Sequence, residues 1–438
     1  MLSALTNAFR TPDLRKKLLF TLMIMAIFRL GSAVPTPGVD YTLVSMCIQG
    51  ADPATGFIGL ANLFSGGALL QLSVFALGIM PYITATIIVQ LLTVVIPRFE
   101  ALKKEGQAGQ AKMTQYSRYL TIGLAVLQSS TLITFARNPG QIFGAHCTQI
   151  LANEHMQTML LMVLTLTAGT GLIMWLGELI TDRGIGNGMS LLIFTSIASG
   201  FPGSLWAIQQ QEGRWDVFIG IILIGFLVMS LVIFVEQSQR RIPVQYAKRQ
   251  VGRRMYGGSS TYIPLKVNMA GVIPVIFASS ILALPALLAQ FAQPAPGQLP
   301  PEWAVWIQNT LTRGDHPVYM ATYVGLILFF TFFYVSITFN PVEVADNMKR
   351  YGGFIPGIRA GRPTAEYLDY VLTRITVPGA TYLAAISLIP LIAIVLFNAN
   401  QNFPFGGTSI LIIVGVGLET VKQIQAQLQQ RNYEGFLR

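Results

Sequence analysis

Residues 57–95 read FIGLANLFSGGALLQLSVFALGIMPYITATIIVQLLTVV and contain two apolar stretches of unequal length. The second stretch, from Ser73 to Val95, has about the 20 residues that a helix needs to cross a bilayer. The first, from Phe57 to Leu72, is shorter and contains Asn, Ser, Gly and Gln, which favours a re-entrant half-helix over residues 57–71. Non-helical backbone at membrane depth survives only inside protein or beside a water-filled cavity, so this interpretation implies a cavity. An amphipathic helix lying on the outer surface is the alternative.

Apolar stretches of spanning length recur along the whole chain. The 438 residues are 53% hydrophobic and 11% charged, whereas an ordinary soluble domain has about 25% charged residues. The sequence therefore predicts an all-α membrane protein with ten transmembrane helices. These helices are expected near residues 18–34, 73–95, 116–136, 157–177, 188–206, 217–236, 268–290, 318–339, 374–397 and 407–424.

The positions of Lys and Arg predict how these helices are oriented. With a cytoplasmic N-terminus, all Lys and Arg residues face the cytoplasm except Arg29, inside the first span, and the outer residues Arg137, Arg214 and Arg313. The opposite orientation would violate the positive-inside rule, so both termini are expected in the cytoplasm. Arg29 is interpreted as a solvated or protein-paired anchor without a role in transport.

The ten predicted spans divide at the short polar loop Gln209–Asp216 into residues 1–208 and 209–438. Because each part has five spans, the two parts have opposite orientations in the bilayer, as in an inverted repeat. Two long connections, residues 237–267 and 340–373, are basic and are expected on the cytoplasmic side. Their length favours a docking surface. The alternative is that their charges only orient the protein and contact lipid head groups.

The sequence lacks the common motifs of catalysis. It has no G-x-x-x-x-G-K-[ST], no H-E-x-x-H and no array of Cys and His with zinc spacing. We therefore expect no catalytic residue, metal or cofactor. Cys47 and Cys147 are too few for a disulfide scaffold, and the sequence leaves open whether they pair. Pro81, Pro274 and Pro285 are expected to bend the spans that contain them.

Several stretches together resemble the SecY family of bacterial protein-conducting channels. They occur in family order over nearly the whole chain. Besides residues 64–95, they are MWLGELITDRGIGNG from Met174, YAKRQVGRR from Tyr246, PLKVNMAGVIPVIFASS from Pro264, NPVEVADNMK from Asn340, PGIRAGRP from Pro356 and FGGTS from Phe405.

The resemblance implies a channel for secretory polypeptides, with two halves around an hourglass pore. Its waist would be a ring of apolar side chains, in which Met189 replaces the usual branched aliphatic residue. The family's ring positions correspond to Ile79, Ile83, Met189, Ile193, Ile276 and Ile412. A plug would seal the outer funnel, and its residues correspond to Phe57, Leu60, Asn62, Leu63, Phe64, Ser65, Gly66 and Gly67.

The resemblance also implies a gate toward lipid and a set of partners. Gln90 and Asn268 would lie at this lateral gate, between the second and seventh spans. Arg249, Arg253, Arg254 and Arg359 would bind the ribosome and its RNA or the SecA motor ATPase. Further expected partners are the small subunits SecE and SecG, signal peptides, nascent polypeptides and membrane lipids. The expected location is the bacterial plasma (inner) membrane, where the channel also releases membrane-protein segments into lipid.

Two alternatives remain open from the sequence. A secondary transporter of inverted five-span repeats would need a coupling-ion site near the bilayer midplane, yet no Asp or Glu is clearly placed there. A membrane enzyme would need a catalytic dyad or a zinc motif inside the spans. Neither requirement is visible in the sequence.

Overall fold

The computed structural model describes residues 9–50, 65–137, 147, 150–151, 155–212, 215–246, 249–251, 254–256, 260–291, 301–311, 316–397 and 407–434. The first part of the chain forms helices α2 (Pro12–Ala33), α3 (Tyr41–Gly50), α5 (Met80–Val95), α6 (Pro97–Lys104), α7 (Gln107–Arg137), α9 (Met156–Arg183) and α10 (Gly188–Glu212). The second part forms α11 (Trp215–Gln237), α12 (Ile273–Phe291), α13 (Glu302–Thr310), α14 (Pro317–Thr338), α15 (Pro341–Arg350), α16 (Arg362–Phe397) and α17 (Gly407–Glu434).

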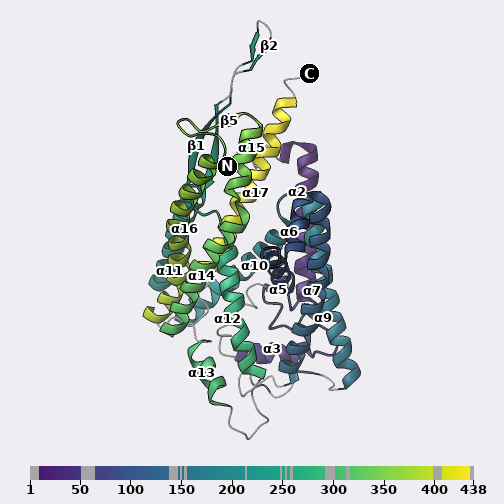
Figure 1. The fold of residues 1–438 in the computed structure, drawn as a ribbon. Coiled ribbons are helices and arrows are strands. Elements are labelled where there is room, and N and C mark those ends of the chain that lie inside the picture. Colours follow the sequence, from purple (N-terminus) through teal and green to yellow (C-terminus); the bar gives the residue numbers. More distant parts are fainter. Residues whose placement is uncertain are drawn as a thin grey trace.

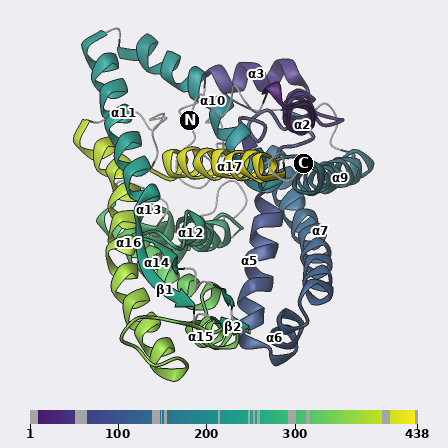
Figure 2. The same cartoon turned by 90° about the horizontal axis from the view of Figure 1, so that it is seen from above.

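The helices form two groups with α17 between them. Helices α2, α5, α7 and α9 lie on one side, and α11, α12, α14 and α16 lie on the other (Figures 1 and 2). Each group has its own apolar core, and a third core joins the groups at the centre of the molecule. This central core takes side chains from α2, α9 and α10, from α12 of the other group and from α17 between the groups.

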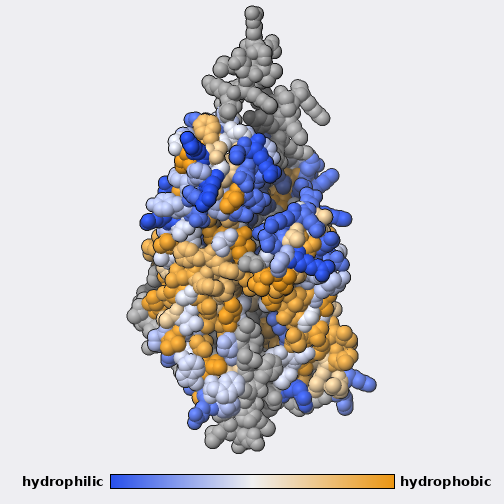
Figure 3. Space-filling view, in the orientation of Figure 1, coloured by the Kyte–Doolittle hydropathy of each residue, from blue (hydrophilic) through white to orange (hydrophobic). Residues whose placement is uncertain are grey.

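Apolar side chains gather on the outward-facing surface of the molecule. Hydrophobic side chains dominate the middle of the surface, and hydrophilic ones gather toward the end that carries the strands (Figures 1 and 3). Large apolar residues are exposed on several helices, among them Leu30, Leu127 and Phe226. A patch of this extent is unfavourable in water but suits contact with lipid tails. The chain is a helical multi-pass membrane protein.

Length and hydropathy alone identify four helical segments of the described chain that could each cross a membrane. They are Met156–Arg183, Pro317–Arg350, Arg362–Ile389 and Ser409–Gln429. The bent pair Met80–Thr93 and Pro97–Lys104 would be a fifth, and Gly188–Pro202, Gly225–Gln237 and Ile273–Leu282 are apolar but shorter. By length and hydropathy, the described helices therefore account for fewer than the ten predicted spans.

Two helices begin later than the sequence predicts. Helix α5 starts at Met80 instead of residue 73, and α12 starts at Ile273 instead of residue 268. The prediction that Pro81 and Pro274 bend their helices is wrong, because each is the second residue of its helix. At that position the missing N–H of proline would have no helical partner anyway. Of the three prolines that were predicted to bend a helix, only Pro285 lies well inside one.

The predicted connections are more ordered than their polar composition indicates. Of the predicted loop Gln209–Asp216, residues 209–212 belong to α10 and residues 215–216 to α11. Residues 237–267 form strands β1 (Gln239–Tyr246), β2 (Arg249–Val251), β3 (Arg254–Tyr256) and β4 (Ser260–Lys266), which the prediction lacked. Strand β1 pairs antiparallel with β4 and with β5 (Gly353–Phe354), while β2 pairs with β3. Residues 340–373 hold α15, β5 and the start of α16.

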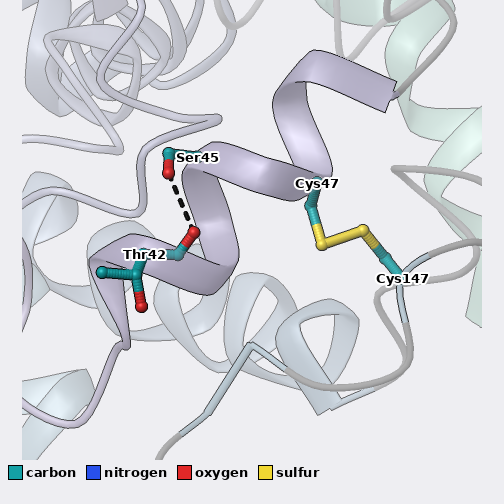
Figure 4. Close-up of a disulfide and its surroundings, with 4 residues drawn as sticks. All are labelled: Thr42, Ser45, Cys47 and Cys147. Carbon is teal, nitrogen blue, oxygen red and sulfur yellow. Dashed lines mark hydrogen bonds between the residues drawn. A yellow bond between two sulfur atoms is a disulfide. The ribbon is translucent and has the colours of Figure 1, made fainter.

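Cys47 and Cys147 form a disulfide, which answers the question that the sequence left open. Cys47 lies in α3, and the two Cα atoms are 5.6 Å apart (Figure 4). The same two segments also meet through their backbones, because the N–H of Asp40 donates to the carbonyl of Ile150 at 3.1 Å. The disulfide therefore joins segments that already pack together.

Candidate functional site

The structure brings all six predicted ring residues into the central core. Four of them are at most 7% exposed and belong to the core itself, namely Ile79, Ile193, Ile276 and Ile412. Ile83 and Met189 are half-buried and pack against it. The six come from α10, α12, α17, α5 and the residue before α5. Residues more than 300 positions apart in sequence thus pack in one apolar cluster.

The backbone makes the same kind of turn just before α5 and just before α12. Residues 78–81 read GIMP and residues 271–274 read GVIP, and in both segments the glycine has a positive φ, +56° at Gly78 and +63° at Gly271. Such a backbone conformation suits glycine, which has no Cβ. The carbonyl of Ile79 accepts the N–H of Ile83 at 3.1 Å, and that of Val272 accepts the N–H of Ile276 at 3.3 Å. Ile83 and Ile276 therefore hold equivalent positions.

A second pair of segments matches in the same manner. Residues 188–193 read GMSLLI and residues 407–412 read GTSILI. Each segment begins a helix, α10 or α17, at its glycine. Ile193 and Ile412 are therefore equivalent, as Ile83 and Ile276 are. These short repeats were visible in the sequence and could have identified four of the six ring positions, but they were not recognised there.

Met189, which departs from the family's branched residue, has a second neighbour besides the core. A Cβ atom added to Gly177 of α9 would lie 2.4 Å from the Met189 sulfur. The methionine therefore fills the space that this glycine leaves between α9 and α10. Its unbranched, flexible side chain suits such an irregular gap.

Only part of the predicted plug lies in the described chain. Phe57, Leu60, Asn62, Leu63 and Phe64 lie outside the described residues, whereas Ser65, Gly66 and Gly67 lie within them. The backbone from residue 66 to 79 is non-helical. It is fastened to the chain after α2, because the N–H and hydroxyl of Thr36 both donate to the carbonyl of Leu72, at 3.0 and 2.6 Å.

Irregular backbone of this kind needs protein around it at membrane depth. The N–H of Val74 donates to the carbonyl of Val34 at 2.9 Å, and the Phe75 ring stacks on Phe28 with centroids 5.8 Å apart. On the other side, a Cβ atom on Gly169 of α9 would lie 2.1 Å from the Val74 carbonyl oxygen. The segment before α5 is therefore buried between α2 and α9.

The two predicted gate residues lie on the segments that lead to the core, but no hydrogen bond joins them. Gln90 is half-buried in α5, and Asn268 lies in the turn before α12. Asn268 is only 3% exposed, and its Nδ2 donates to Glu236 Oε1 at 2.6 Å and to the carbonyl of Gly271 at 3.2 Å. It thereby ties the turn before α12 to the end of α11. Sequence reasoning missed Glu236, since nothing in its local sequence indicates this partner.

Three of the four predicted docking residues are described, and they lie in two separate segments. Arg249 and Arg254 are on the antiparallel strands β2 and β3, and Arg253 lies outside the described residues. Arg359 is exposed after β5, where its carbonyl accepts the Thr364 hydroxyl at 2.8 Å. Figure 1 places β2 and β5 at the same end of the molecule.

Comparison with known proteins decides the family. The sequence model of the SecY family matches residues 73–421. A protein of Streptomyces galbus named protein translocase subunit SecY is 65% identical over the full length of both chains. The chain belongs to the SecY family. Members from Micrococcus luteus and Mycobacterium tuberculosis are 58% and 56% identical, again over the full length of both chains.

Solved structures show the same fold at much lower identity. A structure described as that of a protein-conducting channel has a TM-score of 0.62 and 18% identity, and the match covers 94% of this chain and 91% of the other. Sec61 in a canine ribosome-channel complex has a TM-score of 0.60 and 16% identity, with the same coverage. The SecY fold is therefore retained where most of the sequence has changed.

Proposed function

We propose that this chain is the channel subunit of a protein translocase. It conducts secretory polypeptides across the membrane and releases membrane-protein segments sideways into lipid. The observation that carries the proposal is the meeting of six apolar side chains from four helical segments at the centre of the molecule. The name shared by relatives of up to 65% identity agrees with it. The role is that of a passive channel, and no residue is assigned to catalysis.

A narrow apolar ring can both seal the channel and pass many substrates. Water leaves an apolar constriction readily, and a dewetted constriction blocks ions. The ring of Ile79, Ile83, Met189, Ile193, Ile276 and Ile412 offers no charge and no hydrogen bond that would favour one polypeptide over another. Residues 57–71 would close the outer funnel as a plug above it.

The matching segments support a two-part channel, with residues 1–208 and 209–438 as inverted halves. Gly78–Pro81 and Gly271–Pro274 lead into α5 and α12, which would line the seam between these halves. Gln90 and Asn268 would lie at this lateral gate. With both termini in the cytoplasm of a bacterial cell, the strands β1 to β5 would face the ribosome or motor, and the membrane would be the inner one.

The basic surface supports a set of partners. Arg249, Arg253, Arg254 and Arg359 would contact ribosomal RNA or the SecA motor, because clustered guanidinium groups bind phosphates and carboxylates well. SecE and SecG would complete the channel, and signal peptides, nascent chains and lipids would meet at the gate. The energy for transport would come from the ribosome or the motor.

Crosslinking of a stalled secretory chain tests the channel directly. Cysteines introduced as Ile79→Cys and Ile276→Cys should both crosslink to the stalled chain. Ile281→Cys is the matched control, because Ile281 lies on the same helix as Ile276 but is 39% exposed and is not part of the central core. Crosslinks at residue 281 but not at 79 and 276 would exclude a central pore and revive the transporter alternative.

A further inference from the structure

Arg29 lies at membrane depth and contacts the base of the segment that we propose as the plug. The residue is half-buried in α2, and its Nη1 donates to the carbonyl of Gly66 at 3.0 Å. No ion pair between Arg29 and a described Asp or Glu is found. A cation inside the membrane is costly unless a polar group compensates it. The carbonyl of Gly66 is the polar group that this structure provides.

Gly66 lies tightly between two helices. A Cβ atom on this residue would be 2.8 Å from Arg29 Nη1, 3.1 Å from the Cα of Ser196 and 3.2 Å from the carbonyl oxygen of Ser196. Its φ of +67° also favours glycine. The chain at Gly66 is therefore held from one side by α2 and from the other by α10.

The segment is fixed differently at its two ends. Around Leu72 and Val74, three hydrogen bonds from or to residues 34–36 hold the backbone in place. At Gly66, the side chain of Arg29 provides the corresponding contact. The next residue, Gly67, has φ of +89° and open space where a Cβ would lie, so it offers little resistance to movement.

We propose that Arg29 is a positioning residue that holds the base of the plug in its closed place. This inference rests on the proposed channel function. The guanidinium forms a charge-assisted hydrogen bond, which is stronger than a neutral one yet can be exchanged for water when the segment moves. Opening would then break this contact at Gly66, while the fastening at Leu72 and Val74 remains. Arg29 would therefore favour the closed state without touching the ring.

The test measures how accessible the base of the plug is. Ser65→Cys places a thiol at a site that is 1% exposed, and the native cysteines are already joined in a disulfide. The full chain, purified with its membrane subunits and reconstituted in vesicles, is treated with a maleimide that cannot cross the membrane. We expect Arg29→Met to raise the rate of labelling about tenfold, as for the loss of a hydrogen bond to a charged group. Ion leak from the same vesicles should rise as well.

Two further variants separate positioning from general stability. Arg29→Lys keeps the charge but loses the fork of donors, so its labelling rate should lie between those of the parent and Arg29→Met. Ser32→Ala is the control on the same helix, since the Ser32 hydroxyl donates to the carbonyl of Arg29 and not to the plug segment. Ser32→Ala should leave labelling and leak unchanged. If one Arg29 variant does not fold, the other still carries the comparison.

The outcomes distinguish this inference from the channel proposal. Ile276→Asn, which places a polar amide in the apolar ring, tests the channel proposal in the same vesicles. Labelling at the parental rate in both Arg29 variants would overturn the role of Arg29, even if Ile276→Asn makes the vesicles leak. If Arg29→Met is labelled faster but neither Arg29→Met nor Ile276→Asn makes the vesicles leak, the contact between Arg29 and Gly66 is supported. The channel function on which the inference rests is then overturned.

Discussion

The ammonium group of Lys103 in α6 lies 3.2 Å from the carbonyl oxygen of Ile337, in the last turn of α14. Carbonyls in the last turn of a helix lack a helical partner, and a cation there is favoured by the helix dipole. Because α6 follows α5 and α14 packs with α12, this hydrogen bond links the two groups of helices at the proposed gate. Its neighbour Lys104 instead pairs with Glu100 of its own helix at 2.7 Å.

Lys103→Gln should make the proposed gate easier to open. The contact is exposed, so its loss costs no more than about 1 kcal/mol, or up to about a fivefold change in the closed-to-open ratio. Export of a reporter with a weakened signal sequence should rise by this factor. Lys104→Gln removes the same charge one residue away and should leave export unchanged. Equal effects of the two variants would assign the result to charge and not to the contact with Ile337.

Ile276→Asn should make the closed channel leak ions. An amide at the apolar core binds water, and a hydrated constriction no longer excludes ions by dewetting. The measurement is ion flux through vesicles that contain the purified protein without substrate. Ile281→Asn places the same amide at an exposed position of α12 outside the central core and should not increase the flux. A tight seal in the Ile276 variant would contradict the proposed ring.

Asn268→Leu should loosen the start of α12. The change removes both hydrogen bonds of the Asn268 amide and leaves Glu236 without this donor, which lowers the free energy of unfolding by about 1–3 kcal/mol. Thermal denaturation would measure this loss, and a series of signal sequences would show a changed requirement for hydrophobicity. If the pair acts as a unit, adding Glu236→Gln to Asn268→Leu should cost less than the sum of the single changes. Additive losses would show that the two side chains act independently.

Reduction of the disulfide should destabilise the end of the first group of helices that carries α3. Cys47 and Cys147 are 100 residues apart in sequence, and their bond restricts a long loop in the unfolded chain. Disulfides of this kind contribute about 2–4 kcal/mol. A reducing agent should therefore lower the Tm of the purified protein, whereas the double variant Cys47→Ser, Cys147→Ser should have a low Tm that no reductant changes. An unchanged Tm of the parent protein on reduction would mean that native packing alone holds α3.

Most residues of the candidate site were predicted from the sequence. That prediction used the resemblance to a family and not the periodicity or spacing of the residues. The spacing of Ile79 and Ile83 by four residues is equally compatible with ordinary helix packing. The structure adds that the six ring residues meet in one core and that Met189 also packs against Gly177. The roles assigned to the ring, the gate and the docking arginines stay predictions.

The sequence by itself determined that the chain lies in a membrane, because hydropathy and the length of apolar stretches are local properties that a bilayer of fixed thickness selects. The tertiary structure alone decided where α5 and α12 begin, since those starts depend on backbone turns with a positive φ at Gly78, which is buried, and at Gly271, which is half-buried. It also decided the contacts of Arg29 with Gly66 and of Asn268 with Glu236. Each of these pairs is more than 30 residues apart, so no periodicity or composition in one segment can reveal its partner.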